Sequence, residues 1–127
     1  MIDHVSVPVR DLLAAAQFYE RLLQPLGYAR LVTRPGTIGF GKRYPELWLN
    51  LRADLALAPA NPGGHIALRA ASEEAVRAFH AAALAAGGTS AGLPGPRQAA
   101  MTTYFGAFII DPDGNKLEAV SFQQPNG

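Results

Sequence analysis

The sequence predicts an α+β protein built from two copies of one β-α-β-β-β unit, and two observations carry this prediction. His4 and His65 each begin a stretch in which apolar residues alternate with other residues, the pattern of a strand with one covered face. Each stretch is followed, at the same interval, by a residue type that caps helices, Asp11 or Ser72. The chain therefore repeats one strand and helix pair.

The first unit is expected over residues 1–52. After the strand, apolar residues at helical spacing predict a helix over residues 11–23, which Asp11 caps and which Pro25 and Gly27 end. Alternating apolar residues and a Pro35-Gly36 turn predict three further strands. These strands cover residues 28–33, 37–41 and 46–52. Residues 53–62 read as a linker, because they contain two Pro and an Asn.

The second unit is expected over residues 63–122. A helix begins at Ser72 and stops at Gly87 and Gly88, and a short strand lies near Thr89. Residues 90–103 are rich in Gly and Pro, and we expect a long loop near the functional site. Two strands, 104–110 and 116–122, are joined by a turn at 111–114. The whole chain, residues 1–127, then forms a single domain that ends in a tail at 123–127.

Composition excludes several classes of function. With 49% apolar and 17% charged residues the chain has the make-up of an ordinary globular protein. The net charge is +1 and no Lys/Arg run occurs, so we expect no nucleic-acid partner. The absence of Cys excludes disulfides and thiolate metal sites. Without a signal pattern or an apolar run of about 20 residues, we expect a cytoplasmic protein that does not enter a membrane.

Two phrases carry a resemblance to a known family. The segment Gly64-His65-Ile66-Ala67, together with residues 104–120 and their Asp-Pro-Asp-Gly-Asn-Lys-Leu-Glu sequence, resembles the vicinal oxygen chelate superfamily. That superfamily includes glyoxalase I, bleomycin-resistance proteins and extradiol dioxygenases. The resemblance covers residues 2–122 and implies two curved half-barrels that form a cup around a divalent metal ion. It also implies a small-molecule substrate and a homodimer, which open sheet edges would favour as well.

The resemblance places metal ligands on the first and last strand of each unit. His4, His65 and Glu118 match three of these positions. The internal repeat aligns Trp48 with Glu118, and because an indole cannot ligate a metal, this departs from what glyoxalase I would carry. Two His and one carboxylate suit Fe(II), and also Mn(II), Zn(II) or Ni(II), with coordination positions left for substrate.

Other residues are candidates for contact with substrate. Tyr104 could donate a proton or a hydrogen bond. Trp48, Phe40 and Phe108 could provide stacking surfaces, although Trp48 could equally fill a core. Arg69 is assigned to substrate binding, and Arg69 or Arg97 could instead neutralise Glu118. By helical phase His80 is expected on the surface, and Asp111 and Asp113 are expected to be turn residues only.

Two functions remain open at this level. The first is a metal-dependent enzyme that acts on a small molecule with neighbouring oxygens, with lyase, isomerase and dioxygenase chemistry all open. The second is a metal-free protein of the bleomycin-resistance type, which sequesters an aromatic or drug-like compound. His4 and His65 could also be structural residues, or a vestige that symmetric duplication has preserved.

Overall fold

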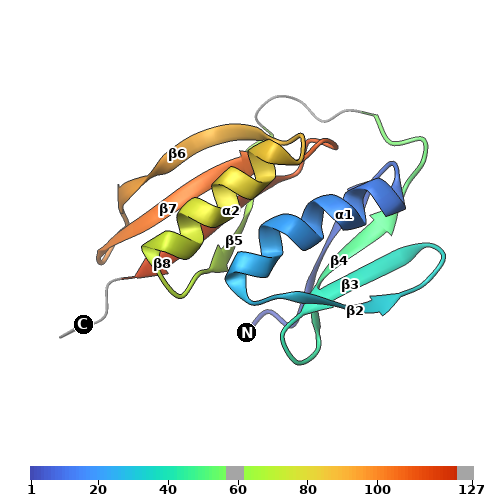
Figure 1. Cartoon of the computed structure of the whole chain (residues 1–127), viewed down its shortest axis with the longest axis horizontal. Coiled ribbons are helices and arrows are strands. Elements are labelled where there is room, and N and C mark those ends of the chain that lie inside the picture. The colour runs from blue at the N-terminus through green and yellow to red at the C-terminus, as the bar shows by residue number, and fades with distance from the viewer. Residues whose placement is uncertain (57–61, 123–127) are drawn as a thin grey trace.

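The computed structural model describes residues 1–56 and 62–122, and it contains the two expected β-α-β-β-β units (Figure 1). The elements of the first unit are β1 (Val5–Val9), α1 (Leu12–Leu23), the short 3-10 helix η1 (Gln24–Leu26), β2 (Ala29–Thr33), β3 (Thr37–Gly41) and β4 (Pro45–Leu51). Those of the second are β5 (Ile66–Arg69), α2 (Glu73–Ala85), β6 (Thr89–Gln98), β7 (Thr103–Ile110) and β8 (Lys116–Phe122). Part of the expected linker and the expected tail at 123–127 lie outside the described residues.

The two sheets have the same strand order, which confirms the internal repeat. The orders are β1-β4-β3-β2 and β5-β8-β7-β6, with the first pair of strands parallel in each sheet. Ser6 pairs with Trp48 in the first sheet, and Ala67 pairs with Glu118 in the second. Trp48 and Glu118 therefore occupy equivalent positions. Both sheets are open, and within the described ranges no strand of one pairs with a strand of the other.

Each helix covers one face of the sheet in its own unit, and the two helices lie side by side (Figure 1). The predicted caps are confirmed: Asp11 Oδ1 accepts from Ala14 N and Ser72 Oγ accepts from Ala75 N, both at 3.1 Å. Apolar side chains of both helices and of the covered sheet faces form one continuous core. The opposite face of each sheet is turned away from the helices. No described helix is long and apolar enough to cross a membrane.

His80 is buried, which corrects the expectation of a surface position. Its side chain lies on the same α2 face as Val76, Phe79 and Ala83, so the buried stripe is one position wider than the sequence indicated. His80 Nε2 lies 2.8 Å from Ser90 Oγ in β6. Burial lowers the pKa of His80 from its ordinary 6.5, because the interior disfavours the charged imidazolium.

The loop expected at 90–103 is largely a strand, which is a second correction. β6 runs to Gln98 and pairs antiparallel with β7, with register shifts around Gly92. The sequence predicted a loop here because proline is typical of turns, and this segment contains Pro94 and Pro96. The edge position of β6 explains why they are tolerated, since one side of an edge strand needs no N–H donors.

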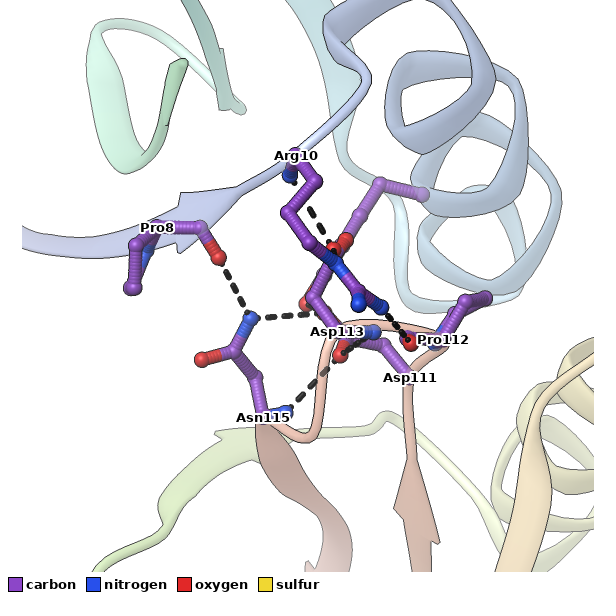
Figure 2. Close-up of polar contacts among 7 residues, drawn as sticks. Pro8, Arg10, Asp111, Pro112, Asp113 and Asn115 are labelled. Atoms are coloured by element: carbon purple, nitrogen blue, oxygen red, sulfur yellow. Dashed lines mark hydrogen bonds and ion pairs between the residues drawn. The ribbon is translucent and has the colours of Figure 1, made fainter. Parts of the chain in front are cut away.

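The turn between β7 and β8 reaches back across the molecule to the first unit (Figure 2). Asp111 is buried, and its Oδ2 accepts hydrogen bonds from Tyr19 Oη at 2.5 Å and Asn115 Nδ2 at 2.9 Å. Its Oδ1 accepts from the backbone N of Asp113 and Asn115. Gly114 closes the turn with a φ of 92°, a conformation that suits glycine. Asp111 was expected to serve the turn alone, and it also binds helix α1.

Two further contacts of this turn hold the start of the first unit (Figure 2). Asp113 Oδ1 accepts from Arg10 Nε at 2.9 Å and from Arg10 N at 3.0 Å. Asn115 Nδ2 also donates to the carbonyl oxygen of Pro8 in β1 at 2.9 Å. Burial raises the pKa of Asp111, although the hydrogen bonds from Tyr19 and Asn115 act the other way. We call this contact between the units, made by residues 111–115 with Pro8, Arg10 and Tyr19, the turn clamp.

The substitution Tyr19→Phe tests the turn clamp. It removes one donor from a buried carboxylate, so the free energy of unfolding should fall by about 1–3 kcal/mol. The matched control is Tyr28→Phe, at a half-buried ring whose hydroxyl makes no side-chain hydrogen bond with the described residues, and it should change the free energy of unfolding by less than about 0.5 kcal/mol. Urea unfolding followed by circular dichroism measures both. Equal effects of the two substitutions would contradict the clamp.

A pH series tests the burial of His80. The folded state disfavours protonated His80, whereas the unfolded chain takes up the proton below pH 6.5. The unfolded state then binds more protons, so stability falls as pH decreases from 6.5 toward the lowered pKa, and His80 contributes no pH dependence above 6.5. In His80→Gln, which can still bond Ser90, this part of the pH dependence should be absent. Thermal unfolding midpoints of both proteins between about pH 5 and pH 8 measure the difference.

Candidate functional site

The candidate site lies on the open face of the second sheet, with Glu118 at its centre. Register places Ala67 of β5 on one side of Glu118 and Phe108 of β7 on the other. Alternation along the strands brings further side chains onto the same face, because every second residue points the same way. These residues are His65, Arg69, Arg97, Tyr104, Lys116 and Phe122. Most of the candidates predicted for substrate contact therefore come together here.

Glu118 is only 4% exposed, although its sheet face is open. Its Oε1 lies 3.1 Å from His65 Nε2, and its Oε2 accepts from the Tyr104 hydroxyl at 2.8 Å. Depending on its tautomer, His65 Nε2 can donate a hydrogen bond to this oxygen or offer a lone pair to a cation beside it. No Arg lies within 4.0 Å of the carboxylate in the described part of the chain, which answers the alternative in which Arg69 or Arg97 neutralises it.

Tyr104 acts on Glu118 as a hydrogen-bond donor. Burial raises the pKa of Tyr104, and the hydrogen bond to Glu118 raises it further, while the charge of Arg97 acts in the opposite direction. The phenol is therefore neutral at neutral pH and donates its O–H in a hydrogen bond to the carboxylate. This role orients Glu118, and it is more specific than the general donor role expected from the sequence.

Phe108 packs between several of these groups. The His65 ring meets it edge to face, with 5.4 Å between ring centroids. Arg69 lies 4.8 Å from the centroid of Phe122, farther along the same face.

A pocket of about 210 Å³ runs beside His65 and Lys116 to Gly114 and Asn115 of the turn clamp. A larger pocket of about 770 Å³ lies elsewhere, next to Arg10 and Arg34, and contains none of the candidate residues.

Gly106 makes room for the site. A Cβ at this position would lie 2.9 Å from Tyr104 Cε2 and 3.1 Å from Glu118 Oε2, closer than the ring can accept without moving. The absent side chain thus allows the Tyr104 ring to cover the carboxylate. Local sequence offers no signal for this role, since a glycine in a strand has several explanations.

The open face of the first sheet carries Trp48. Its ring lies over Gly39, where a Cβ would come within 2.9 Å of it, and Arg34 lies 5.8 Å from the ring centroid. Phe40, expected beside Trp48 as a stacking surface, is fully buried and packs toward Tyr19 on the helix side of the sheet. The reason is alternation, because neighbouring strand residues point to opposite faces. Phe40 is therefore a core residue.

His4 does not join His65 and Glu118 within one copy of the chain. It is exposed and pairs with Asp3 Oδ1 at 2.7 Å. In residues 1–56 and 62–122 no three His, Asp or Glu side chains gather as metal ligands. His65 and Glu118 do fit as two neighbouring ligands, since donors bound at about 2.0–2.2 Å to one cation lie roughly 3 Å apart. The donor pair fits a divalent metal, and the third donor is missing from this arrangement.

Lys116 is a residue of this face that sequence reasoning missed. It lies two residues before Glu118 on β8, with its amine 4.8 Å from the centroid of Phe108. The signal was present, because strand alternation places residues 116 and 118 on one face.

Fold and site together describe a duplicated β-α-β-β-β scaffold with a histidine and carboxylate pair on one open sheet face. The family model described as the glyoxalase/bleomycin resistance protein/dioxygenase superfamily matches residues 1–119, and the chain belongs to this family. A glyoxalase/bleomycin resistance protein from Albidiferax ferrireducens T118 is 33% identical, with a TM-score of 0.82. The match covers 94% of this chain and 98% of that one.

More distant structures share the fold. The fosfomycin resistance protein FosX from Listeria monocytogenes is 16% identical with a TM-score of 0.68, and the match covers 97% of this chain and 93% of FosX. A glyoxalase-related enzyme from Fulvimarina pelagi is 22% identical with a TM-score of 0.67, covering 96% and 88%. The comparison with curated proteins gives no match.

The substitution Gly106→Ala tests the packing of the site. The added methyl group should displace the Tyr104 ring and lower the free energy of unfolding by about 1–3 kcal/mol. In a Tyr104→Ala background the same substitution should cost less, since the ring is gone. Gly95→Ala is the matched control, because Gly95 pairs directly with Gly106 and its Cβ would meet nothing closer than 3.4 Å. Urea unfolding measures the parent, the two single variants, the double variant and the control, and a Gly106→Ala cost that is independent of Tyr104 would contradict this packing.

Proposed function

We propose that the chain is a metal-dependent enzyme that acts on a small molecule with two neighbouring oxygen atoms. The observation that carries the proposal is the buried Glu118 carboxylate, 3.1 Å from His65 Nε2. A buried carboxylate is costly unless a cation or strong donors compensate it, so such a residue indicates a purpose beyond packing. Imidazole and carboxylate donors suit Fe(II), Mn(II), Zn(II) or Ni(II).

We infer that His4 of a second copy completes the donor set. His4 precedes β1 by one residue, as His65 precedes β5, and both strands lie at an edge of their sheets. Within one copy the described residues bring no third donor to His65 and Glu118, so a donor from another copy is needed. A homodimer in which the first sheet of one copy faces the second sheet of the other would bring His4 and Trp48 opposite Glu118.

Each residue of the site has a defined role in this proposal. His65 and Glu118 would hold the cation, which when bound supplies Lewis-acid polarisation of the substrate oxygens. Tyr104 keeps Glu118 in one orientation through its hydrogen bond. Trp48 provides a flat apolar surface and no ligand, which leaves coordination positions for substrate. Lyase, isomerase and dioxygenase chemistry are all compatible with this arrangement.

Metal content tests the proposal directly. Protein purified without a metal-chelating tag should hold about one divalent ion per Glu118, measured by elemental analysis. The variants His65→Ala and Glu118→Gln should lose most of the metal. His4→Ala should also lose metal, because it removes the donor that the second copy of the chain contributes. Glu46→Gln, a change at another strand glutamate, serves as the control and should retain the metal. Retention of metal by Glu118→Gln would refute the assigned site.

One observation favours a second candidate, a metal-free binding protein. Both oxygens of Glu118 already have partners within one copy, His65 and Tyr104, so the carboxylate is satisfied without a metal. In that case the parent protein should hold no metal even after Fe(II), Mn(II), Zn(II) or Ni(II) is supplied. Catechol, a probe with two neighbouring oxygens, should then quench the fluorescence of Trp48 equally in parent and Glu118→Gln protein.

A further inference from the structure

We propose that Arg97 and Lys116 form a subsite for an anionic group of the substrate, a carboxylate or a phosphonate, next to Glu118. The inference rests on the proposed function, because it names the substrate class of the same site. It goes beyond that function in requiring the substrate to carry a negative charge in addition to its neighbouring oxygens.

Geometry places both cations over one aromatic ring at the site. The Arg97 guanidinium carbon lies 5.8 Å from the Phe108 centroid, and Lys116 Nζ lies 4.8 Å from it. Phe108 pairs with Glu118 across the β7 and β8 ladder and contacts the His65 ring. Because each cation contacts this ring, an anion bound by either of them would lie near the His65 and Glu118 donor pair.

Neither cation has a carboxylate partner in the part of the chain that the structure describes. Among the described residues no Asp or Glu oxygen lies within 4.0 Å of Arg97 or Lys116. Within residues 62–122, Glu118 is the only acidic residue that strand alternation places on this face, and its two oxygens are taken by His65 and Tyr104. Arg69 lies on the same face, so three cations stand against one engaged carboxylate and leave an excess of positive charge, which attracts anions.

Backbone carbonyls hold the Arg97 side chain in place. Nη2 donates to Leu93 O at 2.7 Å, and Nη1 donates to Gly95 O at 3.3 Å. Gly92 permits this position, since a Cβ there would lie 3.1 Å from Nη2 and 3.0 Å from the Phe108 ring. A guanidinium has five N–H donors, so donors remain for a ligand. A fixed arginine loses less entropy on binding an anion than a free one, which favours a binding role.

The alternative is that these cations only pack on an apolar ring. Arg77 provides the comparison, because it lies 4.7 Å from the centroid of Phe105 on the helix side of the same sheet. The two arrangements have similar stacking geometry. They differ in that Arg97 and Lys116 share one ring beside a carboxylate and histidine pair, whereas Arg77 stands alone.

Calorimetric titration with phenylphosphonate tests the subsite, on protein kept in EDTA and on protein loaded with Mn(II). We expect Arg97→Gln and Lys116→Gln each to weaken binding about tenfold, the usual effect of removing one charged partner. Arg77→Gln should bind as the parent does. Benzyl alcohol, a neutral probe of similar shape, should bind weakly and equally to all four proteins, and added NaCl should weaken phenylphosphonate binding alone.

The outcomes separate this inference from the proposed function. Loss of phenylphosphonate binding in both variants, with Arg77→Gln unaffected, supports the subsite whether or not metal binds. Unchanged affinity in the variants, or no binding by the parent in either condition, overturns it. If the parent holds metal but shows one of these two overturning results, the proposed metal site is kept and only the anion subsite is rejected. Selective loss in a protein that never holds metal would keep the subsite and reject the enzyme.

Discussion

The relative position of the two halves depends on the buried carboxylate of Asp111. The two sheets share no strand pairing within residues 1–56 and 62–122, so the units are joined by the packing of α1 on α2 and by the turn clamp. Hydrogen bonds from Tyr19 and Asn115 compensate the burial of Asp111. A buried network of this kind stabilises one arrangement strongly when every member is satisfied and is costly when one is not.

Joining the units through their helices has a consequence for function. Both sheets keep an open face, and duplication places Trp48 and Glu118 at equivalent positions on these faces. The backbone scaffold is repeated, but the side chains at the equivalent positions differ. The first sheet carries an indole there, and the second sheet carries a carboxylate. Members of one superfamily can differ in activity for the same reason, because the site is set by a few side chains on a shared fold.

An open sheet face can still bury a charge when aromatic rings cover it. Tyr104 lies over Gly106 and Phe108 lies over Gly92, so the rings approach the strands closely and shield Glu118. Shielding lowers the local dielectric and strengthens the interactions of the carboxylate with His65 and with any cation nearby. The glycines therefore shape the site, because they leave room for the two rings.

The sequence by itself determined the two units, the helix caps at Asp11 and Ser72, and the equivalence of Trp48 with Glu118. These features follow from spacing and alternation, which act over a few residues and so leave a local pattern. Only the tertiary structure decided that β6 is an edge strand, that His80 is buried, and that Asp111 meets Tyr19. Those outcomes depend on which distant surfaces come into contact, and no local pattern records the partner of a side chain that lies far away in the chain.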